Sequence, residues 1–206
     1  MSRIVLLYMS REGQTRKIMD RMAGVLSSRG HECSVVAVDA MPAHFSLSGF
    51  DAFVLGCSIR YGKHHQAFCD YVEANAAQLN SKPVYFFSVN LTARKPHRSQ
   101  PHNNRYLVKY LARSALVPDQ VEVFAGALKY STYDLFNKCM IQLIMKLTGG
   151  STDTSQDIEF TNWRRVIAFA ESFEAFVNDQ SGLNTRENSN ANPYSAGMAS
   201  EAARMM

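Results

Sequence analysis

A short run of hydroxyl and glycine residues near the N-terminus has the composition of an anion-binding loop. Ser10, Gly13 and Thr15 follow the apolar run Ile4–Tyr8, and a helical pattern begins at once. A buried strand that ends in such a turn and opens a helix presents backbone N–H groups to an anion. The two hydroxyls add donors, and the glycine lets the backbone approach closely. The stretch therefore predicts a phosphate-binding loop over residues 10–15.

The residue pattern of this loop excludes two common types of phosphate-binding loop. A nucleoside-triphosphate loop requires Gly, four residues and then Gly-Lys-Ser/Thr, and the stretch contains no lysine. A dinucleotide loop requires G-x-G-x-x-G, and Gly13 is its only glycine. The pattern Ser-x-x-Gly-x-Thr is similar to the loop that binds the phosphate of FMN in flavodoxins. From these residues alone, an ordinary strand–helix turn is the alternative.

Strands and helices alternate along the rest of the chain. Strand-like apolar runs occupy residues 4–8, 35–38, 53–55, 84–87 and 121–126, and helical patterns occupy 14–29, 65–79, 104–115 and 161–177. This alternation predicts an α/β fold with a doubly wound parallel sheet of five strands and helices on both faces. We expect one flavodoxin-like domain at 1–179, with its ligand at the carboxyl ends of the strands.

Three loops are expected to meet at that edge. In the flavodoxin-like order, the first, third and fourth strands end side by side, and each ends here in a small hydroxyl residue. Their coincidence favours FMN as the cofactor. The predicted cofactor-binding residues are Ser10, Arg11, Glu12, Gly13, Gln14, Thr15, Ser58, Ile59, Arg60, Tyr61, Gly62, Ser88, Val89 and Asn90.

Roles within this set follow from residue type. Ser10, Gly13, Gln14 and Thr15 are expected to hold the phosphate, and Arg11 either assists them or is solvated. The loops 58–62 and 88–90 are expected to border the isoalloxazine ring. Tyr61 is the candidate for stacking on that ring by aromatic face-to-face contact, the alternative being a surface aromatic in a loop.

Composition and cysteine usage limit the class of protein. The chain has 206 residues, a hydrophobic fraction of 46% and a net charge of +4, which suit one domain with a buried core. Cys33, Cys57, Cys69 and Cys139 show neither CxxC nor zinc spacing, so we expect buried thiols in a reducing compartment and no metal site. No signal peptide precedes the first strand, and no uncharged apolar run reaches the roughly 20 residues that span a bilayer. We expect a cytosolic protein or one bound to a membrane from the cytosolic side.

Two stretches lie outside the minimal fold. Residues 130–156 hold an apolar helical insertion between the fifth strand and the last helix, with Lys138 and Lys146 among its apolar residues. Such a helix either packs on the domain or a second copy, or contacts a membrane surface or lipophilic ligand. The tail at 180–206 is rich in Ser, Asn, Ala and Gly without periodicity, and we expect it to be disordered.

The stretch 81–118 is basic. It contains no Asp or Glu, whereas its basic residues are Lys82, Arg94, Lys95, Arg98, Arg105, Lys109 and Arg113. Such a patch binds the carboxylates of a ligand, meets anionic lipid, or is merely a solvated face. Nucleic acid is not expected as a partner, because no recognition motif accompanies the patch.

Four stretches resemble one enzyme family in order along residues 3–177. They are Ser-Ile-Arg-Tyr-Gly-Lys-His-His (58–65), Ser-Val-Asn-Leu-Thr-Ala-Arg-Lys-Pro (88–96), Ala-Gly-Ala-Leu-Lys-Tyr (125–130) and Ile-Met-Lys-Leu-Thr-Gly-Gly-Ser-Thr-Asp-Thr (144–154). The family is the flavodoxin-type, quinone-dependent protoporphyrinogen dehydrogenase of bacterial haem biosynthesis. Ordinary flavodoxins lack the Arg-Lys-Pro stretch and the apolar insertion. The resemblance implies FMN, protoporphyrinogen IX as substrate, menaquinone or ubiquinone as acceptor, and peripheral association with the cytoplasmic face of the inner (plasma) membrane.

This resemblance gives the basic stretch a role. A porphyrinogen carries two propionates, and an arginine binds a carboxylate through two parallel hydrogen bonds. We therefore expect Arg94 and Lys95 to orient the propionates, with Arg60 as a further candidate. No catalytic residue is assigned, because the flavin carries the redox chemistry. His64 and His65 are either proton acceptors or ordinary residues at a helix start.

Three rival functions remain. An electron-carrier flavodoxin is usually acidic around its flavin, whereas this chain has a pI of about 8.9. A scaffold that has lost FMN would not need the loop at 10–15. An NAD(P)H:quinone reductase shares the flavin and the quinone, and would differ by accepting electrons from a nicotinamide. Whether the chain self-associates is left open.

Overall fold

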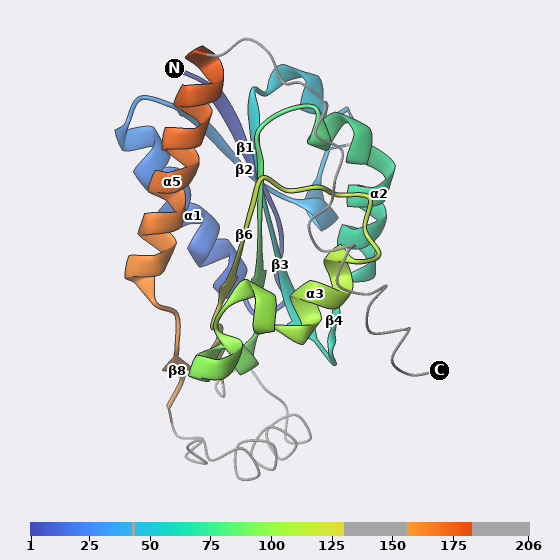
Figure 1. The fold of residues 1–206 in the computed structure, drawn as a ribbon, viewed down its shortest axis with the longest axis vertical. Helices are drawn as coiled ribbons and strands as arrows, with labels where there is room; N and C mark the ends of the chain where they lie inside the picture. The colour runs from blue at the N-terminus through green and yellow to red at the C-terminus, as the bar shows by residue number, and fades with distance from the viewer. Residues whose placement is uncertain (43, 130–155, 183–206) are drawn as a thin grey trace.

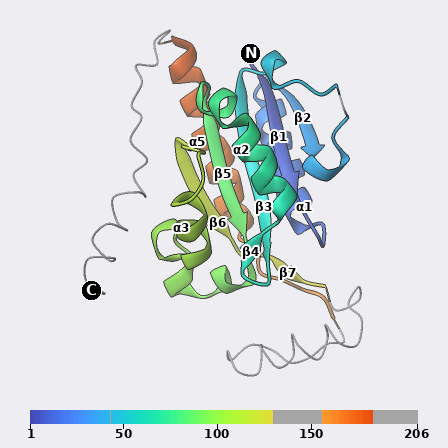
Figure 2. The ribbon, with the colours of Figure 1, turned by 90° about the vertical axis from the view of Figure 1, so that its right-hand side faces the viewer.

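The computed structural model describes residues 1–42, 44–129 and 156–182. Five parallel strands form the centre of the molecule (Figure 1), in the order β2-β1-β3-β5-β6 (Figure 2). Their bounds are Arg3–Met9 for β1, Glu32–Ala37 for β2, Ala52–Arg60 for β3, Val84–Val89 for β5 and Gln120–Phe124 for β6. The predicted flavodoxin-like α/β fold with its five-stranded parallel sheet is therefore confirmed.

Two short additions extend this sheet region. Strand β4 (Lys63–His64) pairs antiparallel with β3, and β7 (Ala127–Leu128) pairs with β8 (Ile158–Glu159) as a separate two-stranded sheet. Short 3-10 helices fill several connections: η1 (Val38–Ala40), η2 (Leu47–Gly49), η3 (Leu91–Arg94), η4 (Pro96–Arg98) and η5 (Pro101–Asn103). The last three occupy the proline-containing loop after β5, where proline at the first helical turn favours such short helices.

Helices cover both faces of the sheet, as predicted. Helices α1 (Gln14–Ser28) and α5 (Trp163–Gly182) lie side by side on one face, whereas α2 (Gln66–Asn80) and α3 (Arg105–Leu111) cover the other (Figures 1 and 2). The central strand β1 is consequently buried on both sides, and Ile4–Leu7 have no exposed surface. This double burial explains why the strand is apolar throughout instead of alternating.

Each face has its own hydrophobic core. The face under α1 and α5 contains the larger aromatic cluster, in which Tyr85 packs against Phe169 and Phe173 at centroid distances of 5.1 and 4.8 Å. The other face is built around Phe68 of α2, which stacks on Phe86 of β5. Ion pairs join Arg29, just after α1, to Glu171 and Glu174 of α5 on this first face.

The third strand differs from its sequence-based prediction. The sequence predicts a strand at 53–55 and a loop at 58–62, but β3 continues to Arg60 and turns into β4 through Tyr61 and Gly62. Both turn residues have positive φ, +50° and +78°. A two-residue hairpin of this type matches the right-handed twist of its strands, and the second position suits glycine. The predicted loop 58–62 is therefore the end of a rigid hairpin.

Some predictions lie at or beyond the edge of the described residues. Helix α5 continues to Gly182, past the expected domain end at 179. Residues 130–155 of the expected insertion and residues 183–206 of the expected tail lie outside the described residues. Within the described part, no helix combines the length and apolarity needed to cross a membrane. The described cysteines Cys33, Cys57 and Cys69 are free thiols.

Candidate cofactor site

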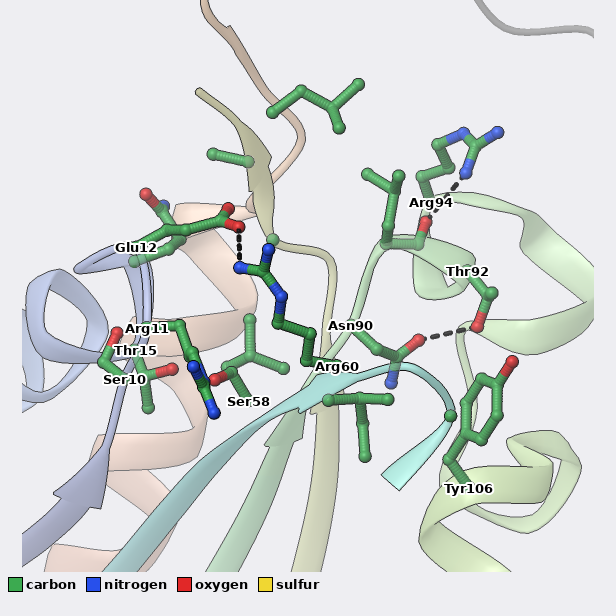
Figure 3. Close-up of a pocket in the computed structure, with 18 of the residues that line it drawn as sticks. Ser10, Arg11, Glu12, Thr15, Ser58, Arg60, Asn90, Thr92, Arg94 and Tyr106 are labelled. Atoms are coloured by element: carbon green, nitrogen blue, oxygen red, sulfur yellow. Dashed lines mark hydrogen bonds and ion pairs between the residues drawn. The ribbon is translucent and has the colours of Figure 1, made fainter. Parts of the chain in front are cut away.

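A pocket of about 340 Å³ lies at the carboxyl ends of β1, β3, β5 and β6 (Figure 3). It is lined by all the predicted cofactor-binding residues except Gly13 and Ser88. The further lining residues are Leu91, Thr92, Arg94, Lys95, Arg98, Tyr106, Gly126, Ala127 and Leu128. The structure thus brings the three predicted loops to one cavity and adds the ends of β6 and α3 to its walls.

The loop after β1 presents unsatisfied donors to this pocket. Thr15 is fully buried, and its hydroxyl has no hydrogen-bond partner among the described residues. Gly13 is the N-cap of α1 with a φ of +81°, and no side chain of the described residues caps the helix. The first N–H groups of a helix have no partner within it, so this end of α1 suits an anion. A phosphate would supply the missing partner of Thr15, and the loop therefore fits one.

Gln14 lines the pocket and is also tied to a distant segment of the chain. Its amide nitrogen donates to the Thr161 hydroxyl at 2.9 Å, and this hydroxyl donates to the Ala125 carbonyl at 2.7 Å. The chain of bonds joins the start of α1 to the end of β6 and to the segment before α5. Gln14 therefore fixes the position of the loop.

A lysine approaches the loop from the segment after β7. The ammonium nitrogen of Lys129 lies 3.5 Å from the position that a Cβ on Gly13 would occupy. This places a positive charge at the end of α1 that already carries the positive part of the helix dipole. An anion between the two would be attracted by both. The lysine was not among the predicted site residues, because it follows the fifth strand at no fixed spacing from the loop.

The hairpin forms the second wall of the pocket. Arg60 Nη1 donates to Glu12 Oε1 at 3.2 Å, and this ion pair connects the hairpin to the loop after β1 (Figure 3). The Arg60 guanidinium also lies over the Tyr61 ring, 5.3 Å from its centroid. Tyr61 itself is 73% exposed. An exposed aromatic at the rim of a pocket is available to cover a planar ligand.

The base of the hairpin is fixed inside the core. His64 is buried, its Nε2 lies 2.9 Å from Ser88 Oγ, and its ring packs on Tyr110 at 4.6 Å. Burial lowers the pKa of His64 to about 3, so the ring is neutral at pH 7. Ser88 is fully buried in this contact and does not line the pocket. Neither His64 nor His65 lines it either.

The loop after β5 is organised by two buried amides. Asn90 Oδ1 accepts hydrogen bonds from the Thr92 hydroxyl at 2.6 Å and the Ala93 amide at 3.1 Å, which caps η3. The same side chain contacts Asn104, whose own oxygen caps α3 by accepting from the Leu107 amide. The two asparagines therefore hold η3 and α3 in a fixed relation beside the pocket.

The pocket is lined by an excess of basic side chains, three of them in the loop after Asn90. Among the described lining residues there are five basic side chains and one carboxylate: Arg11, Arg60, Arg94, Lys95 and Arg98, with Glu12. Arg94 donates to the Leu91 carbonyl at 3.1 Å and lies over the Phe160 ring. Tyr106 adds an aromatic face on this side (Figure 3). No residue pattern indicated Tyr106, because it lies in a helix rather than at a strand end.

Comparison with known proteins identifies the family. Residues 5–155 match the model of the flavodoxin domain, which implies a flavin cofactor. A protoporphyrinogen IX dehydrogenase (quinone) of Escherichia coli (strain K12) is 42% identical over 166 residues, covering 81% of this chain and 91% of the relative. One of Leishmania major is 41% identical over 172 residues, covering 83% and 74%.

Solved structures agree on the fold. A Streptococcus pneumonia TIGR4 flavodoxin superposes with a TM-score of 0.50 and 14% identity, over 86% of this chain and 99% of that one. From its sheet order, its pocket and its sequence relatives, this chain belongs to the flavodoxin family and, within it, to the protoporphyrinogen IX dehydrogenases (quinone).

Proposed function

We propose that this chain is an FMN-dependent enzyme that oxidises protoporphyrinogen IX to protoporphyrin IX in haem biosynthesis, with a quinone as electron acceptor. The observation that carries the proposal is the identity of 42% to the Escherichia coli dehydrogenase over most of both chains. The substrate loses six electrons and six hydrogens, so three quinones become three quinols for each porphyrin formed. Bound FMN supplies the redox chemistry, and the protein supplies position and electrostatics.

The residues around the pocket divide this task. The Thr15 hydroxyl and the uncapped start of α1 are the proposed holders of the phosphate, supported by the buried hydroxyl without a partner. The hairpin, with Tyr61 at its tip, is the proposed cover of the flavin ring. The buried contact between His64 and Ser88 supports that hairpin from below.

Substrate carboxylates are the proposed ligands of the basic wall. The candidates from sequence are Arg60, Arg94 and Lys95, and all three line the pocket. A guanidinium binds a carboxylate with two parallel hydrogen bonds, which orients the ligand as well as attracting it. An electron-carrier flavodoxin usually has an acidic rim with which it docks on a basic protein partner. The positive charge of this pocket wall would repel such a partner, so it argues against the electron-carrier function.

We further propose that the protein works at the cytoplasmic face of the inner membrane, because menaquinone and ubiquinone reside in the bilayer. The apolar sequence at 130–156 is the candidate contact for the bilayer or the quinone. A flotation assay with anionic vesicles tests this. Wild-type protein is expected to float with the vesicles, and a variant lacking residues 134–147 is expected to stay behind and lose quinone-linked oxidation while still binding FMN.

The decisive experiment uses FMN-loaded protein under anaerobic conditions. Protoporphyrinogen IX and a soluble quinone are added, and porphyrin fluorescence and quinone absorbance are followed together. One porphyrin for every three quinones reduced, with no reaction when FMN or quinone is omitted, is the expected result. Flavin binding without porphyrin formation, even with lipid present, would instead support the electron carrier. Flavin reduction by NAD(P)H would support the nicotinamide-dependent reductase.

A further inference from the structure

Two basic side chains of the pocket wall project from one tight turn. Lys95 is the N-cap of η4 and Arg98 is its last residue, and the Arg98 amide donates to the Lys95 carbonyl at 2.9 Å. Both residues line the pocket. The turn therefore offers two positive charges to one ligand.

The backbone of this turn is anchored from two directions. The Arg98 carbonyl accepts a hydrogen bond from Asn104 Nδ2 at 3.0 Å, and Asn104 is 1% exposed. The next carbonyl, that of Ser99, accepts from Arg165 Nη2 at 3.0 Å, while Arg165 is itself paired with Glu122. A turn held by a buried amide and a partly buried guanidinium presents its side chains from a fixed position, which lowers the entropic cost of binding.

The other cations beside the ring end of the pocket already have defined contacts. Arg60 is paired with Glu12, and Arg94 donates to the Leu91 carbonyl and covers Phe160. In contrast, Lys95 and Arg98 form no salt bridge within residues 1–42, 44–129 and 156–182. The stretch 81–118 supplies no acidic residue that would pair with them.

An aromatic side chain lines the same pocket as this charged turn. Tyr106 of α3 approaches the tip of the hairpin, with its Cε1 3.5 Å from the position of a Cβ on Gly62. An aromatic face and two cations in one pocket are complementary to a planar conjugated ring that carries two carboxylates, because the ring stacks while the carboxylates pair.

We propose that Lys95 and Arg98 bind the two propionates of the tetrapyrrole, with Tyr106 against its macrocycle. This rests on the proposed function and refines it, since it assigns the second carboxylate to Arg98, whereas Arg94 supports the loop. The two propionates of protoporphyrin IX stand on neighbouring pyrroles, which suits two side chains from one turn. Free carboxylates, and not the hydrophobic ring alone, are the recognised feature.

The test compares protoporphyrin IX with its dimethyl ester, which has the same ring but no negative charge. Each is titrated into FMN-loaded wild-type protein, Lys95→Gln and Arg98→Gln in non-ionic detergent, with porphyrin fluorescence as the readout. Each substitution is expected to weaken binding of the diacid about tenfold or more, the usual loss for a charged hydrogen bond. Binding of the ester and of FMN is expected to stay unchanged.

Lys109→Gln is the matched control, since Lys109 is exposed, belongs to the same basic stretch and does not line the pocket. It is expected to bind the diacid like wild type. If wild-type protein binds and makes porphyrin but both pocket variants keep its affinity for the diacid, Lys95 and Arg98 do not bind the propionates. The proposed dehydrogenase function would be unaffected by that result. If wild-type protein binds neither protoporphyrin IX nor its dimethyl ester and forms no porphyrin, both the propionate assignment and the proposed function are wrong. Retained FMN binding shows that each variant is folded.

Discussion

The imidazole Nε2 of His64 lies 2.9 Å from the hydroxyl of Ser88, so one buried contact joins the flavin-side hairpin to strand β5. The pair is surrounded by Phe86 and Tyr110, and His64 is 8% exposed. A neutral imidazole is compatible with this setting, whereas a charged one would lose its hydration without gaining a counter-ion. The stability of the hairpin should therefore depend on pH.

We expect the free energy of unfolding to fall as the pH drops from about 6.5 toward 3. The pKa of His64 is lowered to about 3 by burial, so the unfolded chain binds a proton in this range while the folded one does not. The largest slope from this residue is about 1.4 kcal/mol per pH unit. Urea unfolding of His64→Gln should show a flatter pH profile. The exposed His102→Gln should keep the wild-type profile; equal slopes in all three proteins would disprove the role of His64.

Replacing Thr15 by valine should separate folding from phosphate binding. The hydroxyl is buried without a partner in the described structure, so its loss should leave the stability of the apoprotein unchanged or slightly higher. Affinity for FMN should fall by roughly 10- to 100-fold, as expected for a lost hydrogen bond to a charged group. Fluorescence titrations with FMN and with riboflavin, which lacks the phosphate, measure this. A parallel loss for riboflavin would mean that the hydroxyl does not contact the phosphate.

Removing the charge of Lys129 should weaken binding of the FMN phosphate. Its ammonium lies beside Gly13 at the start of α1, so Lys129→Gln should weaken FMN binding by about three- to tenfold at low salt. The difference from wild type should shrink as ionic strength rises, because the attraction is screened. Riboflavin affinity is the internal control and should not change. An FMN affinity equal to wild type at low salt would contradict this contribution.

Gly56→Ala should destabilise the fold without touching the pocket. A Cβ at this position would lie 2.4 Å from Phe87 Cζ and 2.6 Å from Met19 Cε, both inside the core under α1. Overpacking of this kind costs typically 1–3 kcal/mol. Thermal and urea unfolding should show the loss, whereas Gly24→Ala, where a Cβ meets nothing within 4 Å, should be neutral or stabilising. Equal stabilities of the two variants would show that the core can accommodate the methyl group.

Much of the architecture is readable from residue patterns. The apolar run of β1 and the glycine at residue 13 predict a doubly covered strand followed by a helix, and both occur as expected. These features depend on local sequence and burial, which hydrophobic periodicity reports well. The ends of elements were less accurate, as in β3, whose extension depends on pairing with β4 rather than on its own residues.

Pocket-lining residues that directly follow a strand end could be predicted from the sequence. Those that long-range contacts bring to the pocket could not. Ser88 is a small hydroxyl residue at a strand end, like Ser10 and Ser58, yet its side chain points into the core, where it contacts His64. Conversely, Arg98 and Tyr106 reach the pocket because the buried Asn90 and Asn104 fix the loop after β5. Such a pair of amides, fourteen positions apart, leaves no periodic signal in the sequence.

The position of α5 has a consequence for synthesis of the protein. This helix covers one core together with α1, so the first and last described helices of the chain depend on each other. A growing chain would carry an uncovered apolar face on α1 and the sheet until residue 182 has left the ribosome. Thr161, which holds Gln14, also emerges late. The loop after β1, although made first, therefore reaches its final position only after Thr161 has been made.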